Sequence, residues 1–268
     1  MKFAVLNDIH YGVAKPHKGV IKTMSHLSED LLDKSLSYLT SDKDVMFIAD
    51  LGDIVTDANS ETDFANVTKV LEKFSKLKIP TYHIPGNHEQ RTLSDHDLQK
   101  LFGYEKLYFS KELDEYKFIF LYTKETNIKD KVNSEIEISQ EQEKWLENEL
   151  KVSNKKVIIF SHHSLADQDT KNNFYFSGKE HRCLVRNRQK IRSLIDESGK
   201  VIACINAHLH WNNLTIHNNI PYITLQSLVE DFNTNGIPSA SHTIFELNNN
   251  FLKCHVFGND RMEFLKYL

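Results

Sequence analysis

The chain has 268 residues and a formal charge of −4 at pH 7. Because it carries no basic excess, the composition argues against a protein that coats nucleic acid, although a small anionic substrate is compatible with it. No segment reaches the roughly 18 consecutive apolar residues of a membrane span. The first apolar run ends at Asp8, unlike the longer run of a secretory signal, so we expect a cytoplasmic protein. Cys183, Cys204 and Cys254 are few and widely spaced, and we expect them to be small buried hydrophobes.

Short apolar runs alternate with segments of helical periodicity over most of the chain. Buried strands are predicted at 3–6, 45–49, 82–85, 117–122, 157–160 and 201–205. Helices are predicted around 27–39, 64–77, 145–150 and 191–195. After position 210, short strands at 214–216, 222–225, 243–245 and 251–252 follow without a helix, which predicts a β-meander. This order indicates an α/β core whose sheet faces a second sheet. Since no linker divides the chain, we expect residues 1–268 to form a single domain.

Residues that can bind metals follow directly after five of the predicted strands. The clusters are Asp8-Ile9-His10, Gly52-Asp53, Gly86-Asn87-His88-Glu89, Ser161-His162-His163 and Ala207-His208-Leu209-His210. In open α/β sheets, ligands bind beyond the carboxyl ends of the strands, so we expect the loops after these neighbouring strands to meet at one patch. A lone histidine is more often a satisfied polar residue than a ligand. Burying a polar group without a partner is costly, however, and such groups follow five buried strands here. A bound metal would give all of them a partner.

The residue types in these clusters restrict the metal. Aspartate, histidine and asparagine without cysteine form an oxygen and nitrogen ligand set, which suits Mn, Fe or Zn better than a thiolate-bound structural zinc. Asp8 and Asp53 are the carboxylates that we assign as ligands. Two dications carry four positive charges, and two carboxylates cancel half of them. The remaining charge suits a bridging hydroxide and a phosphate anion, as in two-metal sites that clamp the oxygens of an in-line displacement.

In their order and spacing, the five motifs resemble the calcineurin-like metallophosphoesterase superfamily. The resemblance implies a four-layer α-β-β-α sandwich, in which two facing mixed sheets are flanked by helices. It implies two divalent metal ions, Mn²⁺ or Fe first, with Zn²⁺ or Mg²⁺ as alternatives. By residue, it assigns Asp8, His10 and His210 to one ion, Asn87, His162 and His208 to the other, and Asp53 to both. It places His88 beside the metals, as a phosphate-binding group and as the general acid toward the leaving oxygen.

Two positions depart from the family pattern or leave it open. The last motif usually begins with glycine, and here Ala207 stands there, from which we expect a slight backbone constraint and no lost ligand. His162 and His163 are adjacent, and adjacent side chains on an extended strand point to opposite faces. Only one is therefore expected to reach the metals. The resemblance favours His162, and His163 would then lie behind it, face the substrate or be an ordinary loop histidine.

The substrate is less well defined by the sequence. The segments Asp8-Ile9-His10-Tyr11-Gly12 and Leu51-Gly52-Asp53-Ile54-Val55 resemble the branch of cyclic-nucleotide phosphodiesterases and nucleotide-diphosphate hydrolases. Arg91 is the only fixed cation next to the clusters in the sequence, and it could bind a substrate phosphate together with Asn87 and His88, or be an exposed arginine that opens a helix. This shortage of cations favours a phosphodiester or pyrophosphate bond in a small nucleotide-like substrate. A phosphomonoesterase or a protein phosphatase is the alternative.

The segment 164–183 and Trp211 are further candidates for substrate contacts. Phe174-Tyr175-Phe176 could be a lid that stacks on a nucleobase, a dimer contact or the small core of its own loop. Trp211 could stack on a base or pack in the core. We expect a small phosphate-containing substrate, no membrane and no stable nucleic-acid partner, and we leave a homodimer open. A DNA nuclease would need a basic surface, and a non-catalytic scaffold would have lost ligands that this chain keeps.

Overall fold

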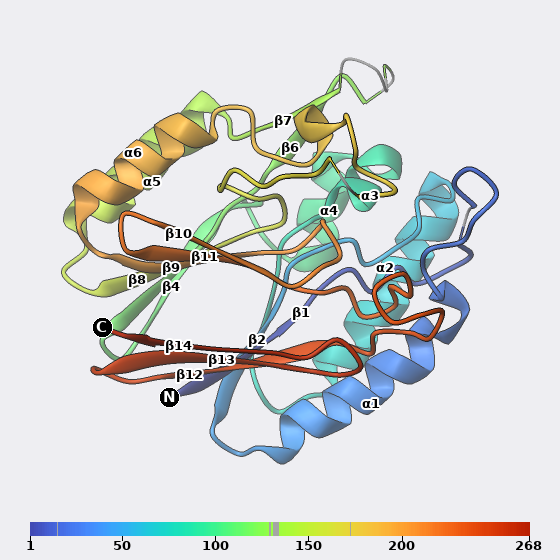
Figure 1. Cartoon of the computed structure of the whole chain (residues 1–268), viewed down its shortest axis with the longest axis horizontal. Coiled ribbons are helices and arrows are strands. Elements are labelled where there is room, and N and C mark those ends of the chain that lie inside the picture. Colours follow the sequence, from blue (N-terminus) through green and yellow to red (C-terminus); the bar gives the residue numbers. More distant parts are fainter. Residues whose placement is uncertain (15, 129, 131–133, 172) are drawn as a thin grey trace.

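The computed structural model describes residues 1–14, 16–128, 130, 134–171 and 173–268. Two sheets face each other, and helices lie outside them (Figure 1). The strands are β1 Lys2–Leu6, β2 Val45–Asp50, β3 Thr81–His83, β4 Phe109–Leu113, β5 Tyr116–Phe120, β6 Lys124–Thr126, β7 Glu135–Glu137, β8 Lys156–Ser161, β9 Val201–Asn206, β10 Asn213–His217, β11 Ile220–Thr224, β12 His242–Leu247, β13 Phe251–Phe257 and β14 Met262–Tyr267. The α-helices are α1 Ser28–Ser41, α2 Ser60–Ser75, α3 Asn87–Thr92, α4 Asp95–Phe102, α5 Gln140–Val152 and α6 Arg188–Ser198.

Both large sheets are mixed. The first has the order β14-β13-β12-β1-β2-β3, in which β1, β2 and β3 are parallel and the C-terminal strands are antiparallel. The second has the order β10-β11-β9-β8-β5-β4, with a parallel centre and antiparallel strands at both edges. Strands β6 and β7 form a separate two-stranded sheet. The predicted sandwich of two facing mixed sheets flanked by helices is confirmed.

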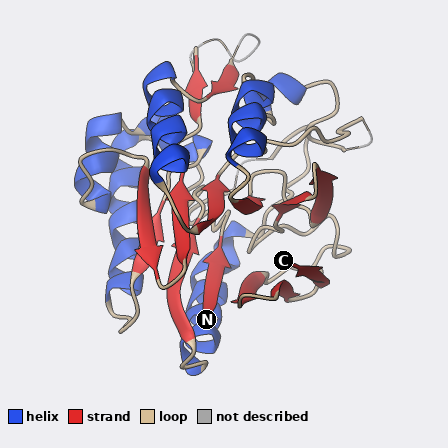
Figure 2. Cartoon of the chain, turned by 90° about the vertical axis from the view of Figure 1, so that its left-hand side faces the viewer, coloured by secondary structure: helices blue, strands red, loops and turns tan. Residues whose placement is uncertain are grey.

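Alternation along the strands builds the four layers. On β1, Phe3 and Val5 point between the sheets, where they join Phe118 and Phe160 of the second sheet in one buried cluster. The intervening residues, with Ala4 as an example, face the opposite way and pack against apolar side chains of α1 and α2. The outer face of the second sheet is covered in the same way by α5 and α6. Figure 2 shows helices on either side of the strands in a second view.

The predicted meander is wrong in its pairing. Strands β10 and β11 form a hairpin that joins the second sheet, where β11 runs parallel to β9. Only β12, β13 and β14 form a meander, and it extends the first sheet beside β1. The short strands were predicted correctly, but their partner strands lie far away in sequence. Strand β12, for example, pairs with β1, and Phe245 lies opposite Phe3. Strands β4, β6, β7 and β14 and helix α3 were not anticipated.

The expectation that the three cysteines are small buried residues is confirmed. All three cysteines are buried and free. None of the helices in the described part of the chain is long and apolar enough to cross a membrane.

Candidate metal centre

The five motifs meet at one end of the sandwich, but from two sheets. Three of them follow β1, β2 and β3 of the first sheet, and two follow β8 and β9 of the second. The expected single patch is confirmed, because Asp8 and Asp53 from the first sheet lie in one cluster with His210, which follows β9. The site therefore depends on how the two sheets face each other.

Two glycines bring the loops after β2 and β3 into contact. A Cβ atom on Gly52 would lie 2.3 Å from the backbone nitrogen of Gly86, and one on Gly86 would lie 2.2 Å from Oδ1 of Asp53. Neither space can hold a side chain. The buried Glu89 carboxylate ties the same loops together, because it accepts the backbone N–H groups of Asp53 at 3.0 Å and Gly86 at 2.8 Å. Glu89 thus positions Asp53 and is a structural carboxylate, as the assignment of ligands to Asp8 and Asp53 required.

The backbone of the site is strained. Several non-glycine residues here have a left-handed backbone, namely Asp8 (φ 49°), His10 (47°), Asp53 (54°), Asp57 (55°), His208 (68°) and His210 (53°). Such conformations cost on the order of 1–3 kcal/mol each and persist only where the surrounding structure imposes them. Five of the six, all but Asp57, are candidate ligands in the loops that follow the strands. The strain is what turns their side chains away from the strand direction and toward a common point.

The first cluster contains Asp8, His10, Asp53 and His210, whose ligand atoms all lie within 4.8 Å of one another. His210 Nε2 is 3.0 Å from His10 Nε2 and 3.3 Å from Asp8 Oδ1. Asp8 Oδ2 accepts a hydrogen bond from the Asn7 side chain at 2.7 Å, whereas the buried Oδ1 has no hydrogen-bond partner among the described residues. An orphaned carboxylate oxygen facing imidazole nitrogens fits a cation between them.

The second cluster contains His162, His163 and His208, again within 4.8 Å of one another. The outer ring nitrogens are engaged: His162 Nδ1 donates to Leu51 O at 2.7 Å, and His208 Nε2 donates to Arg182 O at 3.1 Å. Such bonds fix the tautomer of the neutral ring, in which the other nitrogen carries a lone pair and points inward.

Asn87 completes the second cluster. Its Oδ1 lies 3.2 Å from Nε2 of His162, and the same position is 2.8 Å from Nδ1 of His208 and 3.2 Å from Nε2 of His163. Lone pairs facing lone pairs at these distances repel unless a cation lies among them. Without an ion, the amide is satisfied only when it turns over and points its NH₂ group at the three rings. The donor set therefore fits a metal.

The expectation that only one of the adjacent histidines can reach the site is wrong, because the rings of His162 and His163 lie in the same cluster. Strand β8 ends at Ser161, so His162 and His163 lie in the bend that follows, where the alternation of an extended strand no longer applies. The two rings are 4.7 Å apart and nearly perpendicular, and both point into the second cluster. Thr123 Oγ1 is hydrogen-bonded to His163 Nδ1 at 2.8 Å, which leaves Nε2 facing Asn87.

Asp53 lies between the two clusters. Its Oδ2 is 3.9 Å from His10 Nε2 in the first cluster and 3.4 Å from His162 Nε2 in the second. Its Oδ1 accepts the backbone N–H of His88 at 2.9 Å, which fixes the orientation of the carboxylate. Burial alone raises the pKa of Asp53, but the neighbouring His162 and His88 outweigh it and hold the pKa well below its usual range. Asp53 is therefore an anion placed to face both groups of ligands.

The electrostatics of two histidines, His208 and His210, also suit metal binding. His162 differs from them, because burial lowers its pKa but the Asp53 carboxylate outweighs burial and raises the pKa to about 9. Burial, followed by the neighbouring His163, holds the pKa of His208 well below the ordinary value. Burial, followed by Lys22, does the same for the pKa of His210. A neutral imidazole is the form that binds a metal, so neither ring needs to lose a proton before an ion enters.

His88 lies beside the clusters and outside both groups of candidate ligands. Its Nε2 is 3.9 Å from Asp53 Oδ2, and its Nδ1 is 3.7 Å from Asp57 Oδ2. Its side chain is 22% exposed, unlike those of His10 and His162. Burial lowers the pKa of His88. This partly exposed imidazole, held between two carboxylates at the wall of the cavity, is placed to meet a substrate.

Arg91 is a fixed part of the cavity wall. Its guanidinium donates to Glu125 at 2.9 Å and to Asp57 at 3.2 Å, and its side chain is 17% exposed. It lies in the last turn of α3, so the alternative of an exposed arginine that opens a helix is wrong. The guanidinium also reaches within 2.9 Å of the Asn87 amide.

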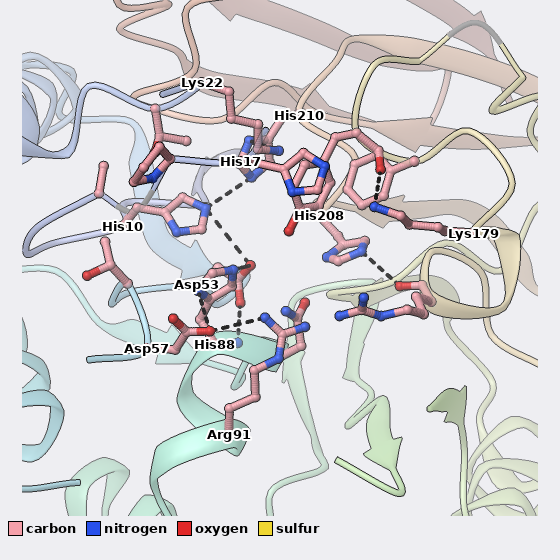
Figure 3. A pocket seen from close by; sticks show the side chains of 18 of the residues that line it. His10, His17, Lys22, Asp53, Asp57, His88, Arg91, Lys179, His208 and His210 are labelled. Carbon is pink, nitrogen blue, oxygen red and sulfur yellow. Dashed lines mark hydrogen bonds and ion pairs between the residues drawn. The ribbon is translucent and has the colours of Figure 1, made fainter. Parts of the chain in front are cut away.

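A cavity of about 650 Å³ opens above the clusters and reveals cations that the sequence did not connect with the site. Lys22, Lys179 and Arg182 line it together with Arg91, and Figure 3 shows Lys22 and Lys179 across the cavity from Arg91. The expectation that Arg91 is the only nearby cation is therefore wrong. Lys22 and Lys179 lie in loops and Arg182 lies in the short 3₁₀ helix Glu180–Arg182, all outside the motifs, and the fold alone brings them to the cavity.

The aromatic residues that were candidates for substrate contacts lie in different surroundings in the structure. Tyr175 and Phe176 line the cavity, whereas Trp211 packs against Phe176 and Cys183 in a small buried cluster and lies outside the cavity lining. Trp211 is therefore a packing residue. Within segment 164–183, residue 172 lies outside the described residues. His17, which matches no motif, also lines the cavity.

The profile of the calcineurin-like phosphoesterases matches residues 1–212. The chain belongs to this family. Membership makes it a metal-dependent phosphoric ester hydrolase, and the two Asp/His clusters described above agree with a dimetal centre. Ala207, which replaces the usual glycine of the last motif, is buried in the core, and His208 and His210 still reach their clusters.

Solved structures with the fold of this calcineurin-like phosphoesterase extend the comparison. A dimetal phosphatase from Danio rerio has a TM-score of 0.76 at 17% identity, with 98% of each chain covered. Purple acid phosphatase PPD1 from yellow lupin seeds has a TM-score of 0.67 at 12% identity, and the match covers 98% of this chain and 53% of that one. GAP50, described as the anchor in the inner membrane complex of Plasmodium, has a TM-score of 0.64 at 15% identity, with 100% and 88% covered. At these identities the likeness shows the fold alone. No curated protein sequence matches significantly.

Proposed function

We propose that the two clusters hold two divalent ions, with Asp8, His10 and His210 on one, Asn87, His162 and His208 on the other, and Asp53 between them. The position of Asp53 Oδ2, 3.9 Å from His10 Nε2 and 3.4 Å from His162 Nε2, supports a shared ligand. His163 Nε2 faces the same point as His162 and is proposed as a further ligand of the second ion. The sulfur-free set suits Mn²⁺ or Fe, with Zn²⁺ or Mg²⁺ as alternatives.

We infer that the enzyme cleaves a phosphodiester or pyrophosphate bond in a small nucleotide-like substrate. The observation that carries this inference is the size and lining of the cavity. At about 650 Å³ it lies within the roughly 300–1,000 Å³ of small-molecule sites. It extends from the ligand clusters to a wall that carries Tyr175, Phe176 and Lys179. A phosphate group alone would leave this wall without a contact, whereas a nucleotide-like substrate has a ring and further oxygens to place there.

The residues around the clusters then have separate tasks. Two bound ions would supply a hydroxide nucleophile at neutral pH and neutralise charge on the phosphate. Arg91, held by Glu125 and Asp57, donates to a phosphate oxygen, and the Asn87 amide lies beside it. His88 protonates the leaving oxygen, and Asp57, 3.7 Å from its Nδ1, supports the charged form of the ring that gives up this proton.

The cations of the cavity favour a second candidate, a phosphomonoesterase. A monoester dianion carries one more negative charge than a diester, and a site for it usually adds cationic side chains beyond the metals. Lys22, Lys179 and Arg182 meet that description. They would equally serve the second phosphate of a pyrophosphate, and the aromatic wall is better explained by the larger substrate.

Two nitrophenyl substrates distinguish the candidates. With saturating Mn²⁺ and equal concentrations, we expect faster hydrolysis of bis(p-nitrophenyl) phosphate than of p-nitrophenyl phosphate. We also expect a cyclic nucleotide or a nucleotide-diphosphate conjugate to be a better substrate than a phosphoprotein. A clear preference for the monoester would overturn the diester proposal and leave the two-metal assignment intact.

A further inference from the structure

A second, smaller cavity of about 230 Å³ lies beside the one described above. Lys22, Tyr175 and His210 line both cavities, so the two meet at a candidate metal ligand. The side cavity is smaller than the roughly 300–1,000 Å³ typical of whole small-molecule ligands. It therefore suits one part of a substrate whose phosphate lies at the ion clusters.

Two phenylalanines give the side cavity an apolar wall that is open to water. Phe174 is 46% exposed and Phe232 is 41% exposed, and their ring centroids are 5.3 Å apart. One comes from segment 164–183 and the other from the loop between β11 and β12, so the fold places them together. Single exposed apolar residues need no explanation. Here two exposed rings are in contact at the rim of a cavity, where they offer a ligand one continuous aromatic surface. Aromatic faces of this kind are suited to stacking on a planar ring.

The loops that carry these rings are held in place by hydrogen bonds. The Glu230 carboxylate, which is buried, accepts the backbone N–H groups of Phe232 at 2.5 Å and Asn233 at 3.3 Å. The Asn233 side chain donates to His210 O at 3.2 Å, which ties the loop to the last metal motif. On the other side, Asn173 Oδ1 accepts the backbone N–H of Tyr175 at 2.8 Å. The aromatic wall is therefore positioned before a ligand arrives.

Lys22 marks the passage between the cavities. Its Nζ is 3.3 Å from His210 Nδ1 and 4.3 Å from the centroid of the Tyr175 ring. Figure 3 shows its side chain at the edge of the cavity next to His210. A cation at this point lies between a phosphate at the clusters and a group in the side cavity. The two amide side chains that line the side cavity, Asn173 and Asn233, suit a ring with polar edges better than a plain hydrocarbon.

We propose that the side cavity binds the nucleobase of the substrate, with the base against Phe174 and Phe232 and its phosphate chain passing Lys22 to the metal centre. This inference rests on the proposed function, because it names the group that makes the substrate nucleotide-like. It also assigns to Phe232, which lies far from every motif, a role in choosing the substrate.

Two substrates that share the same leaving group test the proposal. Thymidine 5′-(p-nitrophenyl phosphate) and methyl p-nitrophenyl phosphate both release p-nitrophenolate, and only the first carries a base. In Phe232→Ala we expect KM for the thymidine ester to rise roughly 5- to 100-fold, the range for loss of one base–aromatic stack, with kcat little changed. KM for the methyl ester should stay within about twofold of the wild-type value. Phe232→Trp, which keeps an aromatic ring, should restore the wild-type KM for the thymidine ester. Equal effects on both esters, or no effect, would overturn the subsite.

A matched control and a binding measurement separate this proposal from the proposed function. Tyr267→Ala removes an aromatic ring that is 77% exposed on β14, and it should change neither KM. Binding of thymidine 5′-monophosphate to the Mn²⁺-loaded protein, measured by calorimetry, should weaken in Phe232→Ala and be unchanged in Tyr267→Ala. Equal binding by wild type and Phe232→Ala overturns the subsite whether or not either ester is cleaved. Failure of the wild type to cleave any phosphate ester would refute the proposed function, while the binding result still decides the subsite.

Discussion

Replacing Gly86 with alanine tests how the backbone builds the metal centre. Gly86 has an extended backbone (φ −90°, ψ −173°) that any residue can adopt, so the cost of Gly86→Ala is steric. The new Cβ would lie 2.2 Å from Asp53 Oδ1 and 2.4 Å from Asp53 N, so Asp53 must move. Overpacking of this kind costs about 1–3 kcal/mol. Loss of the bond from His88 N to Asp53 Oδ1, which is 2.9 Å long, adds about 1.5–3 kcal/mol.

We therefore expect Gly86→Ala to lower the free energy of unfolding by about 2.5–6 kcal/mol. Because Asp53 is displaced by an amount on the order of 1 Å, hydrolysis of bis(p-nitrophenyl) phosphate should fall about 100-fold or more, even at a temperature where the variant is folded. Urea denaturation followed by circular dichroism gives the first quantity, and initial rates with saturating Mn²⁺ give the second.

Gly103→Ala is the matched control. Gly103 ends α4 with φ 71°, and no atom lies within 4 Å of its added Cβ, so only the left-handed backbone penalises alanine. The cost should be about 1–2 kcal/mol, with activity unchanged. The reasoning about the crossing loops is refuted if Gly86→Ala keeps wild-type activity or loses no more stability than Gly103→Ala.

Four substitutions test the roles of three side chains, Asp53, His88 and His163. Asp53→Asn keeps the shape of the proposed bridge and removes its charge, so activity should be almost abolished and metal content should fall well below two ions per chain by elemental analysis; an active variant with two full equivalents would contradict the role. His88→Ala should reduce turnover about 100- to 10,000-fold with little change in bound metal, and the loss should shrink for good leaving groups such as p-nitrophenolate. Equal losses for good and poor leaving groups would mean that His88 only positions the phosphate. His163→Ala should weaken binding of one of the two ions, as seen in a Mn²⁺ titration. Thr123→Val removes the hydrogen bonds of the Thr123 hydroxyl to the ring and the backbone N–H of His163, and it should weaken binding of the same ion by about 10- to 100-fold. Unchanged affinity in both variants would exclude His163 as a ligand.

The features that could be predicted from the sequence are those that depend on residues close together in the chain. Each candidate ligand follows a buried strand within a few residues, so Asp8, Asp53 and His208 could be placed at strand ends without knowing the sheet. The alternation of strands and helices likewise indicated the layers. Strand partners are set by packing over long distances, and for this reason the hairpin of β10 and β11 was assigned to the wrong group of strands.

The surroundings of the site could not be predicted in the same way. Lys22, Lys179 and Arg182 lie in segments without the periodicity of a strand or an α-helix, and only the folded chain shows that they share a cavity. His163 was misjudged because the alternation rule holds for extended backbone, and β8 ends at Ser161, two residues earlier. Motifs thus identified the metal chemistry, whereas the substrate-facing wall depends on loops whose positions follow from the whole fold.

Metal content measured together with activity tests the central claim most directly. The protein is stripped with a chelator and dialysed, and Mn²⁺ is then added in steps while bound metal and hydrolysis of bis(p-nitrophenyl) phosphate are followed in the same samples. The two clusters predict that the stripped protein is inactive, that two ions bind per chain, and that activity reaches its maximum as the second ion binds. Full activity in the stripped protein, or saturation at one ion per chain, would contradict a two-metal centre built on Asp53.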